Sequence, residues 1–193
     1  LILGPNFISP SDVMSKLGMK YSDKELKSLE KIPWSAELLQ ELRDTHILFP
    51  TAPLSILETR AKSPAGLFHD QDWYNGKGFA KSERPEVRWN LVRKQCVPGS
   101  TSKTYSQQLT LLSGNEENLS AVVLVQLMVI HYLMTGTKLF QWEKNDGVRS
   151  SSVSDGYRVG VGFCRGRLSV GGWYGGDGCD SGLGVASVRK FQD

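Results

Sequence analysis

Polar and apolar positions in the first fifty residues follow the helical period in three short blocks. The first block runs from Ser11, which can cap a helix, to Gly18. Ser22 and Glu25 form a capping box that opens the second block, and Ser35 can cap the third. The pattern predicts three short amphipathic helices, and we expect this N-terminal helical segment, residues 1–50, to pack on a main domain formed by residues 51–193.

Between residues 46 and 134 the pattern changes from short elements to one long apolar helix. Apolar positions predict strands over 46–49 and 87–92, and helical spacing predicts helices over 54–61 and 100–112. The run 119–134 is the most apolar stretch, but polar residues interrupt it and it is too short to cross a bilayer comfortably. We therefore expect a buried helix there and no insertion into a membrane.

The chain from Leu139 onward shows no helical period and predicts only strands and loops. Such a region is expected to be sheet and irregular backbone held in place by the preceding elements. Helices in the first part and strands in the last part place the chain in the α+β class.

Glycine is concentrated near the C-terminus, where 11 of the 20 glycines fall in the 29 residues from Gly156 to Gly184. Ordering so many glycines is costly, because glycine gives up more backbone freedom than any other residue. The segment is therefore expected to depend on the rest of the protein for its order.

The same segment lacks Lys, Glu, Gln and Met. These four types make up 35 of the 193 residues, so a 26-residue window should hold about four or five, yet residues 157–182 hold none. The window is rich in Tyr, Arg, Ser, Asp and Gly, which binding loops favour because they combine large contact areas with adaptable polar contacts. This composition indicates a binding surface, and a glycine-rich structural loop system without a binding role is the alternative.

Charge and motifs exclude several other classes of function. The net charge of +3 comes from 23 basic and 20 acidic side chains mixed along the chain, so nucleic-acid binding is not expected. Gly160-Val161-Gly162 could approach a phosphate, but no helix is predicted after it whose N-terminus could hold the anion. His46, His69 and His131 lie on separate elements, and residues 69–72 are interpreted as a polar loop, so we expect neither a metal site nor a cofactor.

Cysteine use and the N-terminal sequence bear on the compartment. Cys96, Cys164 and Cys179 match neither a metal knuckle nor a disulfide framework, which favours a reducing compartment. The N-terminus lacks the basic flank and cleavage pattern of a secretion signal. We expect a cytoplasmic monomer unless the N-terminus has been trimmed.

Two sets of short stretches carry a resemblance to a known family. Near the C-terminus they are Asp155-Gly156-Tyr157-Arg158-Val159, Val161-Gly162 and residues 183–191, and earlier they are residues 6–10, 53–58 and 71–74. These stretches resemble the variable proteins of diversity-generating retroelements, which are found in small-genome bacteria, archaea and their viruses. The resemblance covers most of the chain.

In that family, adenines of a template copy are randomised during reverse transcription, so Asn codons of the AAY type become a restricted residue set. The set includes Tyr, Phe, Cys, Arg, Ser, Asp and Gly, and it excludes Lys, Glu, Gln, Met and Trp. The residue types missing from 157–182 agree with this set, and Trp173 would then be a fixed framework residue. The resemblance implies a receptor-type binder of a macromolecule, expected to be a protein, and not an enzyme.

The resemblance also implies a C-type lectin fold, in which a terminal strand such as Gly184 to Phe191 closes an antiparallel sheet with long loops nearby. Inward framework positions are expected at Val159, Val161, Leu168, Val170, Trp173, Leu183 and Val185. The candidate ligand-binding face comprises Tyr157, Gly160, Phe163, Cys164, Arg165, Arg167, Ser169, Gly171, Gly172, Tyr174, Gly175, Gly176, Asp177, Gly178, Cys179, Asp180, Ser181 and Gly182. Exposed positions on such a scaffold can change at a cost of about 0.5 kcal/mol or less.

Two other functions stay open. Formylglycine-generating and iron-dependent oxidase enzymes share the implied fold, but they need a reactive cysteine pair or a histidine cluster. Cys164 and Cys179 could approach each other, although both lie among the presumed variable positions. A structural display or tail component is the other alternative. The sequence lacks a Glu-Pro-Asn or Trp-Asn-Asp motif, so calcium-dependent sugar binding is not supported, and its many glycines indicate a weak binding surface in this copy.

Overall fold

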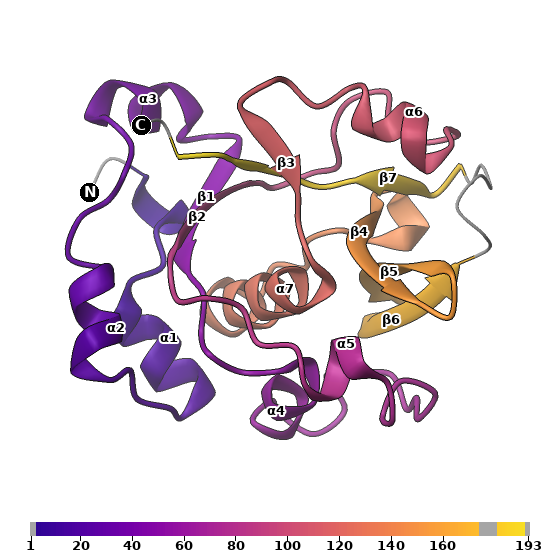
Figure 1. Cartoon of the computed structure of the whole chain (residues 1–193), viewed down its shortest axis with the longest axis horizontal. Helices are drawn as coiled ribbons and strands as arrows, with labels where there is room; N and C mark the ends of the chain where they lie inside the picture. The colour runs from indigo at the N-terminus through magenta and orange to yellow at the C-terminus, as the bar shows by residue number, and fades with distance from the viewer. Residues whose placement is uncertain (1–2, 174–180, 192–193) are drawn as a thin grey trace.

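The computed structural model of the chain describes residues 3–173 and 181–191. It is an α+β protein in which the long helix α7 lies between two four-stranded sheets (Figure 1). The helices are α1 (Pro10–Leu17), α2 (Asp23–Ser28), α3 (Ala36–Leu42), α4 (Ile56–Ala61), α5 (Gly78–Lys81), α6 (Tyr105–Leu109) and α7 (Ala121–Thr135), with 3-10 turns η1 (Gly4–Asn6) and η2 (Trp142–Lys144).

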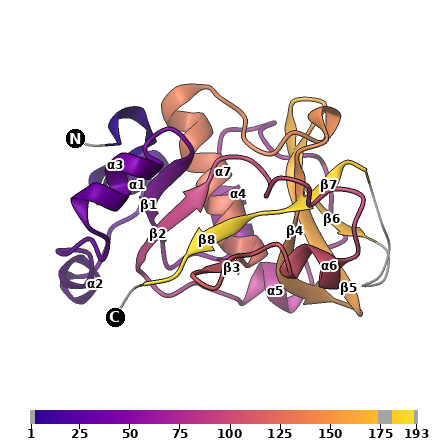
Figure 2. The same ribbon diagram turned by 90° about the horizontal axis from the view of Figure 1, so that it is seen from above.

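The two sheets are joined by the C-terminal part of the chain. The first sheet has the order β1 (His46–Pro50), β2 (Trp89–Arg93), β8 (Ser187–Arg189), β3 (Glu116–Asn118), and all its neighbours are antiparallel. The second has the order β6 (Arg167–Trp173), β5 (Tyr157–Cys164), β4 (Gly147–Ser154), β7 (Leu183–Val185), with β7 parallel to β4. Only Ala186 separates β7 from β8, so the single terminal strand expected over 184–191 is wrong: the chain changes sheets there (Figure 2).

The N-terminal helices begin mostly where their caps predict. Ser22 with Glu25 and Ser35 cap α2 and α3, as expected. The cap predicted at Ser11 is wrong, because Ser9 accepts the hydrogen bond from the Asp12 backbone at 3.1 Å and Pro10 takes the first helical position.

The first fifty residues also contribute a strand to the main sheet. β1 pairs with β2 along its whole length, from His46 opposite Arg93 to Pro50 opposite Trp89. The expected boundary between the N-terminal segment and the main domain, after residue 50, therefore falls at the end of a paired strand. The N-terminal segment covers this sheet, since Trp89 Nε1 donates to the Leu29 carbonyl at 3.0 Å.

Helix α7 is buried on all sides from Ala121 to His131, which confirms the prediction of a buried helix. It ends at Gly136, whose φ of 72° gives the left-handed C-cap that glycine favours. No helix in the described part of the chain is long and apolar enough to cross a membrane.

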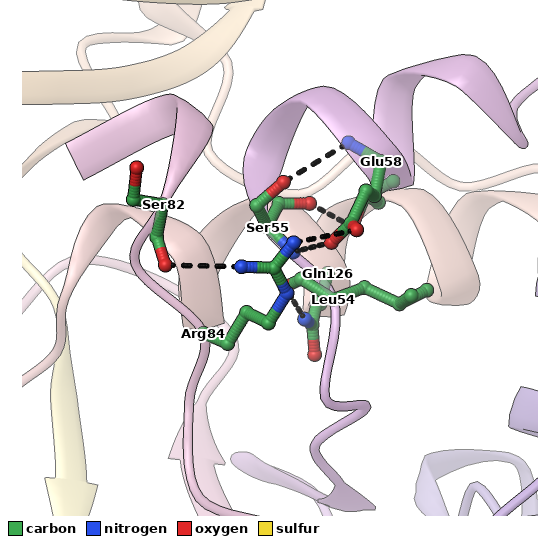
Figure 3. A network of polar contacts seen from close by, with 7 residues as sticks. Leu54, Ser55, Glu58, Ser82, Arg84 and Gln126 are labelled. Carbon is green, nitrogen blue, oxygen red and sulfur yellow. Dashed lines mark hydrogen bonds and ion pairs between the residues drawn. The ribbon is translucent and has the colours of Figure 1, made fainter. Parts of the chain in front are cut away.

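A buried glutamine of α7 fixes the chain that leads into α4. Gln126 Nε2 donates to the carbonyls of Ala52 and Leu54 at 2.9 and 2.8 Å, and its Oε1 accepts from the Ala52 backbone at 2.8 Å. Figure 3 shows Gln126 beside the start of α4, where Arg84 pairs with Glu58 at 2.6 Å. These bonds satisfy the polar groups of a segment that has no sheet partner of its own.

Two further predictions differ in length or type from the structure. The helix expected over 100–112 is present only as α6, because Thr104 caps it and the preceding residues form turns. The region after Leu139, expected to contain only strands and loops, also contains the 3-10 turn η2.

Candidate functional site

The β5–β6 hairpin has a buried side and an outer side. Val161 pairs with Val170 and Phe163 pairs with Leu168, and all four side chains are fully buried. Among the predicted framework positions, burial is confirmed for Val159, Val161, Leu168, Val170, Leu183 and Val185. The side chain of Trp173 lies outside the described residues.

The expectation that Phe163 faces solvent is wrong, because its side chain is 0% exposed. Phe163 lies two residues after Val161 and therefore points to the same side of the strand. Its ring lies 5.8 Å from that of Tyr132 at the end of α7. Phe163 is thus part of the framework although phenylalanine belongs to the adenine-derived residue set.

Gly160 and Ser169 also belonged to the expected face, and both are buried. Gly160 lies in the middle of the sheet, where it pairs with Arg149 on one side and Gly171 on the other. Ser169 is 5% exposed because Gln71 covers it, and its hydroxyl lies 3.4 Å from Gln71 Oε1.

The remaining described members of the expected face reach the surface to different degrees. Tyr157 is 45% exposed. The exposed members also include Arg165, Arg167, Gly172 and Ser181, and Cys164, Gly171 and Gly182 are half-buried. Predictions at Tyr174, Gly175, Gly176, Asp177, Gly178, Cys179 and Asp180 lie outside the described residues.

The hairpin tip is a two-residue turn whose shape limits what can stand there. Arg165 and Gly166 have φ of 46° and 82°, as the tight primed turns between antiparallel strands require. A non-glycine residue in this region is uncommon, and Asn and Asp tolerate it best. The backbone N–H of Arg165 donates to the Glu143 carboxylate, which lowers the pKa of Glu143. The tip is therefore fixed in place rather than free.

A loop from Leu67 to Trp73 covers the outer edge of β6. Leu168 donates to the Leu67 carbonyl at 2.8 Å, and the His69 backbone donates to the Leu168 carbonyl at 2.9 Å. Further along, Trp73 Nε1 donates to the Val170 carbonyl at 2.9 Å. The loop thus satisfies the free edge of the strand and brings its own side chains beside the candidate face.

A hollow of about 650 Å³ opens beside these elements. Its described lining residues are Gln71, Trp73, Trp142, Ser154, Asp155, Tyr157, Ser169, Gly171 and Gly172. Four of them, Tyr157, Ser169, Gly171 and Gly172, belong to the predicted face. The other five were missed because they lie outside the compositionally unusual window, and for Gln71 and Trp73 the only sequence signal was the family resemblance of residues 71–74.

The hollow combines aromatic walls with a few hydrogen-bonding groups. Trp73, Trp142 and Tyr157 supply large contact areas, and Gln71 and Ser154 supply amide and hydroxyl groups. Asp155 forms an ion pair with Lys77 at 2.7 Å, which holds the pKa of this exposed carboxyl below its usual value. Such a lining suits the contact surface of a neutral or weakly charged ligand group.

The Trp142 ring packs directly against two glycines. A Cβ added at Gly147 would lie 1.6 Å from Trp142 Cδ1, and one added at Gly162 would lie 2.5 Å from Trp142 Nε1. At Gly172 the nearest atom, Trp73 Cη2, would be 3.6 Å away, an ordinary contact. Gly147 and Gly162 are therefore needed for the packing of Trp142, whereas Gly172 leaves room for a side chain.

The described histidines and cysteines do not form a reactive cluster. Within residues 3–173 and 181–191, no three His, Cys, Asp or Glu side chains are placed to hold a metal ion. His131 is buried and its Nδ1 lies 3.2 Å from the Thr137 carbonyl oxygen, while His69 Nε2 lies 3.0 Å from the Cys164 carbonyl. Burial, with a contribution from Asp146, raises the pKa of Cys96 to about 11, so this thiol is not activated as a nucleophile.

Comparison with known proteins identified no relative of this chain. No family model matches the chain, and no curated protein or solved structure is significantly similar to it.

Proposed function

We propose that the protein is a receptor-type ligand-binding protein on a C-type-lectin-like scaffold, whose β5–β6 surface is diversified by retroelement-directed adenine mutagenesis. Its ligand is a macromolecule, and a protein is the partner for which such a surface is best suited. In this proposal the protein has no enzymatic activity and uses no cofactor.

The observation that carries the proposal is the division of one short segment into two sets of positions. Val159, Val161 and Val170 are completely buried, whereas Tyr157 and Arg167 on the same hairpin are exposed. The whole window 157–182 also lacks every Lys, Glu, Gln and Met. Buried framework residues fix the backbone, so exposed side chains can change with little effect on stability.

The hollow supports binding by a composite surface. Gln71, Trp73 and Trp142 come from outside the glycine-rich window, whereas Tyr157 and Gly171 come from within it. In the proposed system, the outside residues supply a constant aromatic contact in every copy. The window residues then supply specificity, and glycine at 171 and 172 leaves the hollow open in this copy.

An enzyme on the same fold is the second candidate, and no observation favours it. A formylglycine-generating or oxidase-like activity needs a reactive cysteine pair or a histidine cluster. Cys164 is half-buried, and its possible partner Cys179 lies outside the described residues.

Selection from a displayed library tests the proposal. The first library randomises Tyr157, Arg165, Arg167, Gly171 and Gly172 to the residues that adenine mutagenesis can produce. A control library applies the same set to the five exposed positions of α2, none of which is among the described lining residues of the hollow. Both are selected against a panel of unrelated proteins. We expect specific binders from the first library only, and equal yields from the two libraries would contradict the proposal.

A further inference from the structure

A second cavity lies at the end of β2, beside the loop that follows α7. Its volume is about 680 Å³, and the charged side chains in its described lining are Arg93, Lys94, Lys138, Lys144, Asp44 and Asp146. None of these residues lines the hollow beside β6. The cavity is therefore separate from the proposed protein-binding surface.

Positive charge is in excess around this cavity, with four cationic side chains against two carboxylates. The formal charge of these six side chains is therefore +2, compared with a net charge of +3 for the whole chain. Both carboxylates already have partners. Asp44 lies 3.6 Å from Arg43, and Asp146 accepts from the Cys96 backbone at 2.7 Å. Burial raises the pKa of Asp146, whereas the hydrogen bonds from Cys96 and the charge of Lys144 act in the opposite direction.

The four cations of the cavity form no close ion pair within the described residues, although Asp146 interacts electrostatically with Lys144 over a longer distance. In the described part of the chain, none of Arg93, Lys94, Lys138 and Lys144 forms an ion pair with a carboxylate. Arg93 Nε is buried and has no hydrogen-bond acceptor. Arg93 as a whole is half-buried and lines the cavity, so its unpaired Nε–H is a donor that a ligand group could satisfy.

A buried histidine opposite Arg93 has one unsatisfied ring nitrogen. His46 lies opposite Arg93 in the β1–β2 register, is 1% exposed, and its Nε2 has no hydrogen-bond partner. Its Nδ1 is 2.8 Å from the hydroxyl of Thr45, which lines the cavity. Burial, and to a smaller extent the positive charges of Arg93 and Arg189, lower the pKa of His46 to about 4. The ring is therefore neutral and does not compete with the four cations for an anion.

The cavity walls are held in place without a ligand. Lys138 Nζ lies 5.7 Å from the Tyr132 ring centre and 5.9 Å from that of Phe163. The Gln141 carbonyl accepts from the backbones of Lys144 and Asp146 at 3.0 and 3.1 Å, which closes the loop into a fixed turn. A ligand would therefore meet a backbone turn that is already formed and one ammonium group, that of Lys138, already placed by its ring contacts.

We propose that this cavity binds a small molecule that carries at least two anionic groups, either phosphates or carboxylates. A cavity of about 680 Å³ has room for a small molecule that carries two such groups, and pyrophosphate is the smallest probe that presents two linked phosphates. Lysine and arginine are the side chains that bind such groups, by charge-assisted hydrogen bonds. This site does not depend on the proposed diversified surface.

Titration calorimetry with inorganic pyrophosphate at constant ionic strength tests the proposal, with acetate as the singly charged comparison. We expect pyrophosphate to bind with a dissociation constant of about 1 mM or tighter, and acetate not to bind measurably. The double variant Lys94→Gln, Lys144→Gln should lose about tenfold in affinity for each lysine removed. The control variant Lys24→Gln, Lys27→Gln removes two exposed charges of α2 and should bind like the unaltered protein.

Two outcomes would overturn the site. One is the absence of pyrophosphate binding to the unaltered protein, and the other is an equal loss of affinity in the cavity and control variants. Far-ultraviolet circular dichroism checks that each variant is folded. If the double variant does not fold, Lys144→Gln alone serves instead, because Lys144 is exposed and its replacement leaves the core unchanged.

Discussion

Gly162 and Gly172 lie on adjacent strands of one hairpin, yet we expect them to differ sharply in their tolerance of a side chain. Neither has a positive φ, so alanine fits the backbone at both sites. A Cβ at Gly162 would lie 2.5 Å from Trp142 Nε1 and 2.8 Å from the Phe140 carbonyl oxygen. That oxygen cannot easily move, because it accepts a hydrogen bond from the Phe163 backbone at 2.8 Å.

The expected magnitudes follow from these contacts. Overpacking of this kind costs about 1–3 kcal/mol, so Gly162→Ala should be destabilised by that amount. For a chain of this size, the midpoint of thermal unfolding should fall by roughly 2–12 °C. Gly172→Ala places its Cβ 3.6 Å from Trp73, an ordinary contact, and should change the free energy of unfolding by no more than about 0.5 kcal/mol.

Urea unfolding followed by circular dichroism measures both variants against the unaltered protein. The m-values should stay the same, so that midpoint shifts report stability alone. Equal midpoints for the two variants, or a neutral Gly162→Ala, would refute the assignment of Gly162 to the framework and Gly172 to the replaceable surface.

Three further outcomes are expected. Phe163→Ala should destabilise the protein by about 3–5 kcal/mol and Tyr157→Ala by less than about 0.5 kcal/mol, and comparable losses in thermal melts would argue against the burial pattern of β5. Gln126→Leu leaves the Ala52 and Leu54 backbone groups without partners, so it should lower the free energy of unfolding in urea by about 3 kcal/mol or more. Arg84→Ala removes an exposed ion pair and should lower it by no more than about 1 kcal/mol. Burial lowers the pKa of His46 to about 4, so the unfolded chain binds a proton below about pH 6.5 that the folded protein does not bind. The free energy of unfolding should therefore fall by about 2 kcal/mol from pH 6.5 to pH 5. If His46→Gln shows the same pH dependence as the unaltered protein, this account of His46 is wrong.

Local signals in the sequence were sufficient for the helices that carry their own caps. Ser22 with Glu25 and Ser35 each cap a helix at the expected place, because capping bonds span only three residues. The central helix was equally predictable from its long, mainly apolar run. The division of the C-terminal strand into β7 and β8 was not, since it depends on pairing with strands far away in the chain.

Burial within the candidate face could be predicted only in part for the same reason. The valines of β5 alternate, so their inward direction followed from the two-residue period. Phe163 lies in register with Val161, so the two-residue period indicates burial, whereas its residue type indicates a variable, exposed position. Trp142 packs against β4 and β5 and Gln71 meets β6, and no periodicity or composition near either residue indicates these contacts, which form only in the folded chain.

The central claim is that interchangeable residues are displayed on a fixed frame, and sequencing sibling copies of the gene with their template tests it most directly. We predict substitutions that trace to template adenines, fall within residues 157–182, and concentrate at Tyr157, Arg167 and Gly172 while Val161 and Leu168 stay constant. Substitutions scattered evenly along the gene, or as frequent at the buried positions as at the exposed ones, would contradict it.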